Sequence, residues 1–274
     1  MEPGEAVVSP RPLSADERNR VLLATDRLRT ALMTRTPCSP VRDLIGADDL
    51  DLAYAVQQQL IALVATDPIV GRKIGATSAA VQEQLGVDQP DFGVLTGGMQ
   101  VPVGECIPMG VLLQPKVEAE IAFVLRTDLD DGDLDLEQMA NSVEVAMPAI
   151  EVVDSRIRGW DISFADTVAD NASSGLFVLG ESSAPLSQFS PIDAQMEMRV
   201  NDDVVSRGEG RACLGDPLSA LSWLARCARD FGQPLRAGQI ILSGALGPMH
   251  PIQTGDHVTV EISGLGRVEA VAAS

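Results

Sequence analysis

Two stretches near the start of the chain place apolar residues at the spacing of a helix. The first begins at Ser14, and Glu17 three residues later completes the pattern of a capping box. The second begins near Asp48 or Asp49 and runs to about residue 64. The pattern predicts two consecutive amphipathic helices, separated by the Pro-containing residues 37–40. Their apolar positions are Val21, Leu22, Leu28, Ala31, Leu32, Ala53, Val56, Leu60, Ile61 and Val64.

From Pro68 onward, short apolar runs bounded by turn residues replace the helical spacing. The runs do not alternate regularly with helices, which favours an α+β fold with a mixed or antiparallel sheet over a Rossmann sheet. We therefore divide the chain into a flexible tail (1–13), a helical N-terminal section (14–67) and a larger domain (68–274). The expected strands are 69–75, 111–126 (one strand or a pair), 146–153, 176–179, a hairpin at 195–205 turning at Asn201-Asp202, 239–243, and 257–272 hinged at 264–266; the expected helices are 77–85, closed by Gly86, and 216–232.

The charge balance narrows the possible functions. The chain has 39 Asp and Glu residues against 20 Lys and Arg, a formal net charge of −19, which argues against binding to nucleic acid or to an anionic membrane surface. The four Cys residues show no C-x-x-C spacing and are interpreted as reduced thiols. Neither a signal-peptide pattern nor an apolar run of about 18–20 residues is present. The sequence therefore predicts a cytoplasmic protein.

Two carboxylates lie two residues apart in the strand predicted at 111–126. Glu118 and Glu120 share one face of that strand, while Ala119, Ile121 and Phe123 point to the other. Adjacent carboxylates repel each other unless solvent or a cation separates them. Two interpretations remain open at this point, namely a solvated strand face and a pair of oxygen ligands for a hard divalent ion.

A third carboxylate, Glu151, lies in the almost wholly apolar run 147–153. If it is buried, it must be paired, protonated or coordinated. The alternative is a glutamate at a strand edge beside the positive charges of Arg156 and Arg158. Three carboxylates without a nearby histidine favour Mg²⁺ or Mn²⁺ over zinc or copper.

Lys73 and Asp91 are further charged candidates. Two glycines, Gly71 and Gly75, flank Lys73 and would let a ligand or another backbone approach closely. Lys73 is then an acid, a base or an anion-binding group, or else an exposed strand lysine. Asp91 lies in a turn-rich loop, where capping of backbone amides is the usual role. Two segments, 166–175 and 242–248, combine small residues, hydroxyls and glycines that suit a small polar ligand. For 166–175 the alternative is a helix end followed by a turn.

Several segments, taken in order along the chain, resemble the 2-keto-4-pentenoate (2-hydroxypenta-2,4-dienoate) hydratases of the fumarylacetoacetate hydrolase superfamily. The resemblance extends from about residue 14 to the C-terminus. The segments that carry it are 71–78 (GRKIGATS), 85–93 (LGVDQPDFG), the pair Glu118-x-Glu120, 148–156 (PAIEVVDSR), 166–175 (DTVADNASSG) and 241–249 (ILSGALGPM).

This resemblance implies a fumarylacetoacetate-hydrolase-like mixed β-sheet roll or sandwich, with residues 68–274 as the catalytic domain and the helical section in front of it. It implies that Glu118, Glu120 and Glu151 bind Mg²⁺ or Mn²⁺, and that Lys73 matches the lysine of the family. Other superfamily members have a threonine where this chain has Ala245. A contact with the substrate carboxylate at that position is therefore left to backbone amides.

The resemblance also implies a metal-dependent lyase that adds water to a small anionic 2-hydroxydienoate in the meta-cleavage catabolism of aromatic compounds or steroids. Hydratases for pentadienoates and hexadienoates would share these residues, so the chain length of the substrate stays open. We expect Lys73 and Asp91 to be the acid–base or water-positioning pair. The residues expected to contact substrate are Thr77, Ser173, Ser174, Ser243, Gly244, Ala245 and Leu246.

Three alternatives accompany this interpretation. One is a 2-oxo-3-enedioate (4-oxalocrotonate) decarboxylase on the same scaffold. Another is a non-catalytic partner subunit of a decarboxylase or aldolase, and the third is an aldolase that forms a Schiff base through Lys73. The resemblance further implies a homo-oligomer, with association with a pathway decarboxylase or aldolase as a further expectation.

Overall fold

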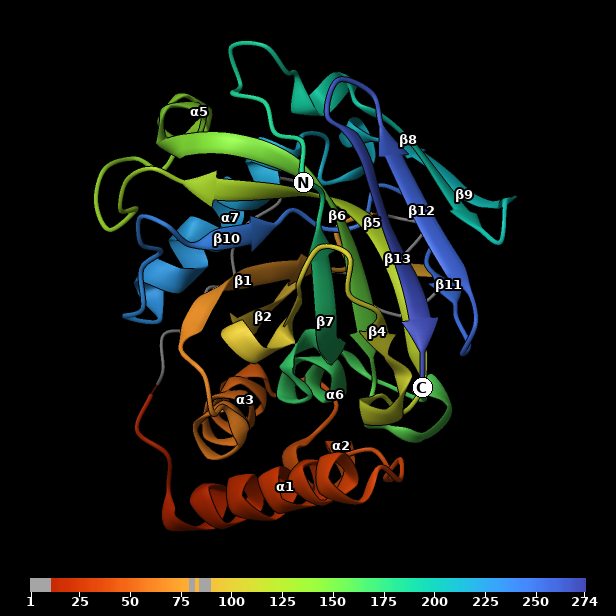
Figure 1. Cartoon of the computed structure of the whole chain (residues 1–274). Helices are drawn as coiled ribbons and strands as arrows, with labels where there is room; N and C mark the ends of the chain where they lie inside the picture. Colours follow the sequence, from red (N-terminus) through yellow and green to blue (C-terminus); the bar gives the residue numbers. More distant parts are fainter. Residues whose placement is uncertain (1–10, 79–81, 84–89) are drawn as a thin grey trace.

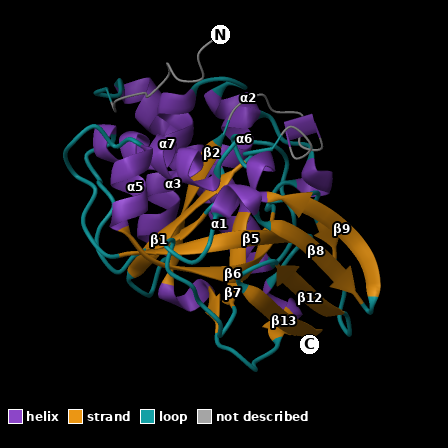
Figure 2. Ribbon diagram, turned by 90° about the horizontal axis from the view of Figure 1, so that it is seen from above, coloured by secondary structure: helices purple, strands orange, loops and turns teal. Residues whose placement is uncertain are grey.

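The computed structural model describes residues 11–78, 82–83 and 90–274. Helices gather at one side of two β-sheets, and the smaller sheet lies at the other side (Figure 2). Within the described residues the helices are α1 (Ala15–Thr34), α2 (Arg42–Ile45), α3 (Leu50–Val64), α5 (Leu136–Ser142), α6 (Phe164–Ala169) and α7 (Pro217–Asp230).

Helices α1 and α3 confirm the two helices expected from the N-terminal pattern. Ser14 and Glu17 form the reciprocal capping box, and the Asp49 side chain caps α3 by accepting from the Leu52 N–H. One position of the stripe is wrong, because Leu22 is 52% exposed. Residues 1–10 of the expected tail lie outside the described part, and Arg11 forms ion pairs with Glu17 and Asp51.

The strands form two mixed sheets. The larger has the order β2-β1-β10-β5-β6-β7-β3, with β11 beside β5, and the smaller has the order β4-β13-β12-β8-β9. The strands are β1 (Ile69–Gly75), β2 (Asp91–Thr96), β3 (Gln100–Val101), β4 (Ile107–Pro108), β5 (Pro115–Leu125), β6 (Val143–Asp154), β7 (Ser174–Leu179), β8 (Gln195–Val200), β9 (Asp203–Glu209), β10 (Ile240–Leu242), β11 (His250–Pro251), β12 (His257–Ile262) and β13 (Gly266–Ala273).

The long antiparallel pair β5 and β6 forms the centre of the molecule (Figure 1). Strands β12 and β13 of the smaller sheet pack against β6, and the interior between the sheets is filled by residues such as Ile121, Phe123 and Ile150. In β5, residues 117–123 are all buried, so both faces of this central part of the strand are covered. Any carboxylate on such a strand is buried as well.

The strands expected near residues 69–75, 111–126, 146–153, 176–179 and 239–243 are confirmed as β1, β5, β6, β7 and β10. The hairpin at 195–205 is β8 and β9, whose turn residues Asn201 and Asp202 have positive φ angles of 52° and 68°. Helix α7 begins after the Asp216 cap and ends before Gly232. The helix expected at 77–85 falls largely on residues outside the described ones. Across the described residues, no helix combines the length and apolar character needed to cross a membrane.

Candidate metal centre and active site

Three glutamates from the two central strands meet in the interior. Glu118 and Glu120 lie two residues apart on β5, and the antiparallel register places Glu118 directly opposite Glu151 on β6. One carboxylate oxygen from each lies within 4.8 Å of the other two. Because none of the three side chains is more than 4% exposed, the interpretation of Glu118 and Glu120 as a solvated strand face is wrong.

The three carboxylates are not satisfied by protein groups alone. Burial, followed by the charge of Glu151, raises the pKa of Glu118 to about 7, and the same causes raise the pKa of Glu120 further above its usual range. Among the described residues, Glu120 Oε1 and Glu151 Oε2 accept no hydrogen bond, and Glu151 Oε1 has only an ion pair with Lys73. Buried oxygens without donors, in a set made only of carboxylates, fit a hard divalent cation.

Lys73 is the buried cation that faces this cluster. Its Nζ lies 3.2 Å from Glu151 Oε1, and its side chain is 3% exposed. Burial by itself lowers the pKa of Lys73, but the charges of Glu151 and Asp91 outweigh burial and raise it, so Lys73 is protonated. The exposed-lysine interpretation of Lys73 and the strand-edge interpretation of Glu151 are both wrong. The sheet brings the two residues together although β10 and β5 separate β1 from β6.

Asp91 begins strand β2 and pairs with Gly75 of β1, so its placement in a turn-rich loop is wrong. A Cβ atom at Gly75 would lie 2.1 Å from Asp91 Oδ1 and 3.3 Å from Lys73 Nζ. Glycine at this position therefore leaves the space that the Asp91 carboxylate and the Lys73 ammonium group need to lie side by side. Asp91 is 2% exposed, and burial raises the pKa of its carboxyl group despite the nearby charge of Lys73.

The segment after β10 closes one side of the carboxylate cluster. The backbone N–H of Gly244 donates to Glu120 Oε2 at 2.7 Å. The Ser243 hydroxyl accepts from Ile121 N–H and donates to the Gly244 carbonyl, so it fixes the segment against β5. Ala245 packs with Val153 and Met249 in a small apolar cluster, whereas Leu246 is fully buried in the main core. Among the predicted substrate contacts, Ser243 and Leu246 thus have structural roles.

Thr77 lies beside the same segment. A Cβ atom at Gly244, whose φ angle is +100°, would lie 2.1 Å from Thr77 Oγ1, so the close approach of the two residues requires glycine. The Thr77 side chain is buried, and among the described residues its hydroxyl has no oxygen or nitrogen hydrogen-bond partner. Such a buried hydroxyl next to the carboxylate cluster suits a predicted substrate contact.

Segment 166–175 combines the end of α6, a left-handed turn and the start of β7. Asn171, Ala172 and Ser173 have φ angles of 55°, 50° and 53°, a conformation that costs about 1–2 kcal/mol for each L residue. The Asn171 amide holds the turn by accepting from Val94 N–H and donating to the Val94 carbonyl. The Ser174 hydroxyl donates to the Asn171 carbonyl, so Ser174 stabilises the turn while Ser173 lies near Thr167 at 3.4 Å.

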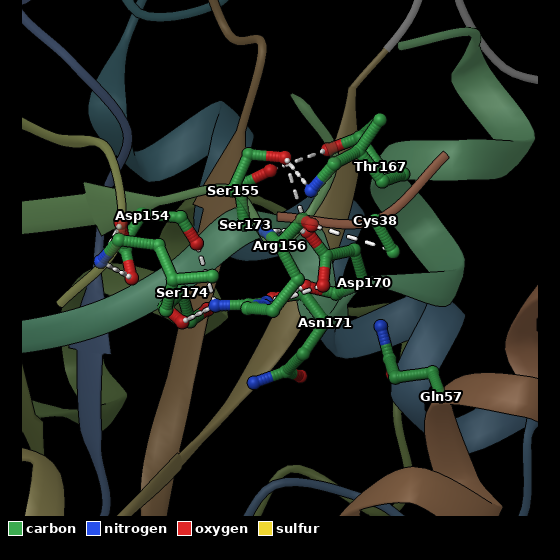
Figure 3. Close-up of polar contacts among 12 residues, drawn as sticks. Cys38, Gln57, Asp154, Ser155, Arg156, Thr167, Asp170, Asn171, Ser173 and Ser174 are labelled. Atoms are coloured by element: carbon green, nitrogen blue, oxygen red, sulfur yellow. Dashed lines mark hydrogen bonds and ion pairs between the residues drawn. The ribbon is translucent and has the colours of Figure 1, made fainter. Parts of the chain in front are cut away.

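A buried ion pair holds the residues on either side of this turn (Figure 3). Arg156 Nε donates to Asp170 Oδ1 at 2.5 Å, its Nη1 donates to the carbonyls of Asp154 and Ser174, and its Nη2 donates to the Asp170 carbonyl. The Ser155 hydroxyl donates to the other carboxylate oxygen of Asp170. Burial raises the pKa of Asp170 to about 6 although Arg156 opposes this shift.

Sequence reasoning missed several residues around the site. Thr167 donates a hydrogen bond to Asp91, and Gln57 donates to two backbone carbonyls, those of Phe92 and Val168. Thr167 stands in segment 166–175, whose composition suits a small polar ligand, but nothing distinguishes it from the other polar residues there. Gln57 stands in a helix without a distinguishing motif. A polar Gln57 among apolar neighbours on the buried side of α3 was the available signal.

The mixed two-sheet fold and the buried carboxylate cluster define the class of protein. A model of the fumarylacetoacetate (FAA) hydrolase C-terminal family matches residues 74–272, and the chain belongs to this family. Among its relatives, the "TodF product hydratase" of Pseudomonas putida is 52% identical over 252 residues, which cover 91% of this chain and 94% of the relative. The "2-keto-4-pentenoate hydratase 2" of Dechloromonas aromatica is 51% identical and covers 90% and 95%.

More distant comparisons extend the same picture. The "2-hydroxyhexa-2,4-dienoate hydratase" of Comamonas testosteroni is 38% identical, covering 88% of this chain and 92% of the relative. Among solved structures, 4-oxalocrotonate decarboxylase from Pseudomonas putida G7, complexed with magnesium and adipate, is 32% identical with a TM-score of 0.87, covering 96% and 99%. The expected α+β fold of the fumarylacetoacetate hydrolase type is confirmed.

Proposed function

We propose that this protein is a metal-dependent hydratase that converts 2-hydroxypenta-2,4-dienoate, or a close 2-hydroxyalka-2,4-dienoate, to the 4-hydroxy-2-oxo acid. The observation that carries the proposal is the buried group of three glutamates with Lys73 and Asp91 beside it. Relatives named as hydratases, at 47–52% identity, support this reaction over the alternatives.

Glu118, Glu120 and Glu151 would hold the divalent ion, for which we propose Mg²⁺ or Mn²⁺ because carboxylate oxygens suit both ions. When bound, such an ion supplies a Lewis acid that favours ionisation of the 2-hydroxyl group of the substrate. The Gly244 N–H, which donates to Glu120 Oε2, fixes the orientation of one of these carboxylates. The cation also offsets the mutual repulsion that raises the pKa values of Glu118 and Glu120.

The reaction moves protons and one water molecule. The 2-hydroxyl proton is lost and C5 gains a proton, after which the water oxygen bonds to C4 and C3 gains the second proton. We assign the proton transfers to Asp91, because its buried carboxyl group lies beside Lys73 near the three glutamates and burial raises the pKa of that carboxyl group. Lys73, which stays protonated, would hold the anionic substrate and the charge that develops on it.

Thr77, Ser173 and the backbone N–H of Ala245 would orient the substrate, since the Gly244 N–H already donates to Glu120 Oε2. Thr77 is proposed because its hydroxyl is buried beside Gly244 and, among the described residues, has no oxygen or nitrogen hydrogen-bond partner, and Ser173 because the left-handed turn brings it near Thr167. In place of the threonine found in other superfamily members, Ala245 adds apolar surface beside Val153 and Met249. This surface suits the hydrocarbon end of a short dienoate.

A substrate comparison tests the function. With Mg²⁺ or Mn²⁺ present, we expect rapid loss of the dienol absorbance of 2-hydroxypenta-2,4-dienoate and formation of 4-hydroxy-2-oxopentanoate. The decarboxylase alternative, suggested by the structural likeness to 4-oxalocrotonate decarboxylase, predicts CO₂ release from 4-oxalocrotonate instead. Release of CO₂ without hydration of the dienol would contradict our proposal. A panel of longer dienoates would then establish the preferred chain length.

Metal binding should depend on pH in a defined direction. The folded-state pKa of Glu118 is about 7, above its ordinary value of 4.5. Between these two pH values, the metal-free folded state therefore binds more protons than the unfolded chain. Protonated Glu118 therefore favours the metal-free folded state. This contribution to the free energy of unfolding is fully present below about pH 4.5 and is lost as the pH rises through 7. Because protons compete with the metal, we expect Mg²⁺ to raise the melting temperature more at pH 8 than at pH 5.5. Equal shifts at both pH values, measured against chelator-treated protein, would contradict a metal site at these carboxylates.

A further inference from the structure

Thr167 lies between Asp91 and Ser173, with 3% of its surface exposed. Its hydroxyl donates to Asp91 Oδ2 at 3.2 Å and lies 3.4 Å from the Ser173 hydroxyl. Since a threonine hydroxyl has one proton, Ser173 must be the donor in the second contact when the first is made. Asp91 Oδ1 has no hydrogen-bond partner among described residues, so Thr167 is the side chain that fixes the Asp91 carboxylate within that part of the chain.

The short helix that carries Thr167 is anchored at both ends by buried carboxylates. At its start, Asp166 accepts from the backbone N–H groups of Val41 and Arg42 and from the Arg42 guanidinium at 2.9 Å. At its end, Asp170 accepts from Arg156, which also donates to the Asp170 carbonyl. Figure 3 shows Thr167, Arg156 and Asp170 in one continuous group of polar contacts. Two anchors on so short a helix leave Thr167 little freedom to move.

Gln57 of α3 ties the two partners of the Thr167–Asp91 contact together. Its Nε2 donates to the carbonyl of Phe92 at 2.9 Å and to the carbonyl of Val168 at 3.0 Å. Phe92 follows Asp91 and Val168 follows Thr167 in the sequence, so this amide group links the two backbones directly beside the contact. Gln57 is 2% exposed and is therefore held rigidly.

We propose that Thr167 is a positioning residue for Asp91, and that Gln57 sets the distance between them. This proposal rests on the proposed function, in which Asp91 transfers protons. Thr167 does not touch the substrate in this scheme. It holds the Asp91 carboxylate in one orientation through its hydroxyl group, so that proton transfer does not require a reorientation first.

Thr167→Val removes the hydroxyl at nearly constant volume and tests the proposal. We expect kcat to fall about 10- to 100-fold, while KM and the Mg²⁺ concentration for half-maximal activity change less than about twofold. Thr167→Ser keeps the hydroxyl and should restore most of kcat. Gln57→Leu should also lower kcat, although the Thr167 hydroxyl is still present in this variant.

Thr25→Val provides the matched control. Thr25 is also a buried helical threonine, but it lies in α1 and its hydroxyl has no partner among the described residues. Its replacement should leave kcat unchanged. Wild-type kcat in a folded Thr167→Val protein, or a serine variant as slow as the valine variant, would overturn the positioning role.

The wild-type assay separates this proposal from the proposed function. A wild-type protein that does not consume the dienol would contradict the proposed function itself. In that case a crystal structure of Thr167→Val decides the positioning role alone, since a displaced Asp91 carboxyl group would support it and an unmoved one would overturn it. Should the valine variant not fold, Thr167→Ala is measured against Thr25→Ala in the same way.

Discussion

Replacement of Glu120 by Gln is expected to reduce the metal-dependent turnover of the dienol at least about 100-fold, because one of the three oxygen ligands loses its charge. The fold should survive this change. Glu120 is fully buried and its pKa is raised well above the ordinary value by burial and by Glu151, so a neutral amide removes a source of repulsion in the metal-free protein. We therefore expect the melting temperature in chelator to stay equal or to rise.

Glu144→Gln is the control for this variant. Glu144 lies on β6, the same strand as Glu151, but its side chain is exposed. Its replacement should leave both turnover and the stabilisation by Mg²⁺ unchanged. Full activity of Glu120→Gln in Mg²⁺, or wild-type activity in excess chelator, would exclude a catalytic metal at this cluster.

Replacement of Arg156 by Met is expected to cause the largest loss of stability. The Arg156 and Asp170 side chains are 4% and 0% exposed, and removal of one partner of a buried ion pair costs about 3–5 kcal/mol because the other charge stays buried without compensation. For a protein of this size, we expect the melting temperature to fall by roughly 6–20 °C. Thermal denaturation, followed by circular dichroism, measures this change.

The loss should be smaller at low pH. Protonation of Asp170, whose folded-state pKa is raised to about 6 by burial even with Arg156 present, removes the uncompensated charge in the variant. Arg199→Met serves as the comparison, because Arg199 forms an exposed ion pair with Glu197 at 2.6 Å and such pairs contribute about 0–1 kcal/mol. Equal losses in the two variants would show that the Arg156–Asp170 pair stabilises the fold no more than a surface pair does.

The metal cluster illustrates what a single sequence can predict. The two-residue period of a strand put Glu118 and Glu120 on one face, and this local rule is confirmed by β5. Whether that face is wet or buried depends on the second sheet and on β6, which no local pattern specifies. The position of Glu151 opposite Glu118 depends on the antiparallel register of β5 and β6. The apolar run around Glu151 marked it as a candidate third carboxylate, and the resemblance to a family then grouped it with the other two.

Asp91 shows the opposite case, in which a local signal was misleading. The residues before it, Gln89-Pro90, and Gly93 after it are typical of a turn, yet Asp91 begins a buried strand at the edge of the larger sheet. Along this edge, side chains form the backbone hydrogen bonds that a neighbouring strand would otherwise form. Asn171 bonds to both backbone groups of Val94, and Gln57 donates to the Phe92 carbonyl. Such partners are 35 to 77 residues distant in sequence and leave no periodic trace.

The Gln57 bridge and the Arg42–Asp166 contact have a consequence for how this protein tolerates change. Gln57 and Arg42 both precede residue 74, where the match to the family model begins. Mutations in the N-terminal helices should therefore lower turnover as mutations of active-site residues do, although these helices lie outside the part of the chain that carries the three glutamates. Random mutagenesis scored by activity should yield inactive variants at residues 42 and 57 as well as at the acidic cluster, and shortening the chain from its N-terminus past α3 should abolish activity before it removes any of the three glutamates.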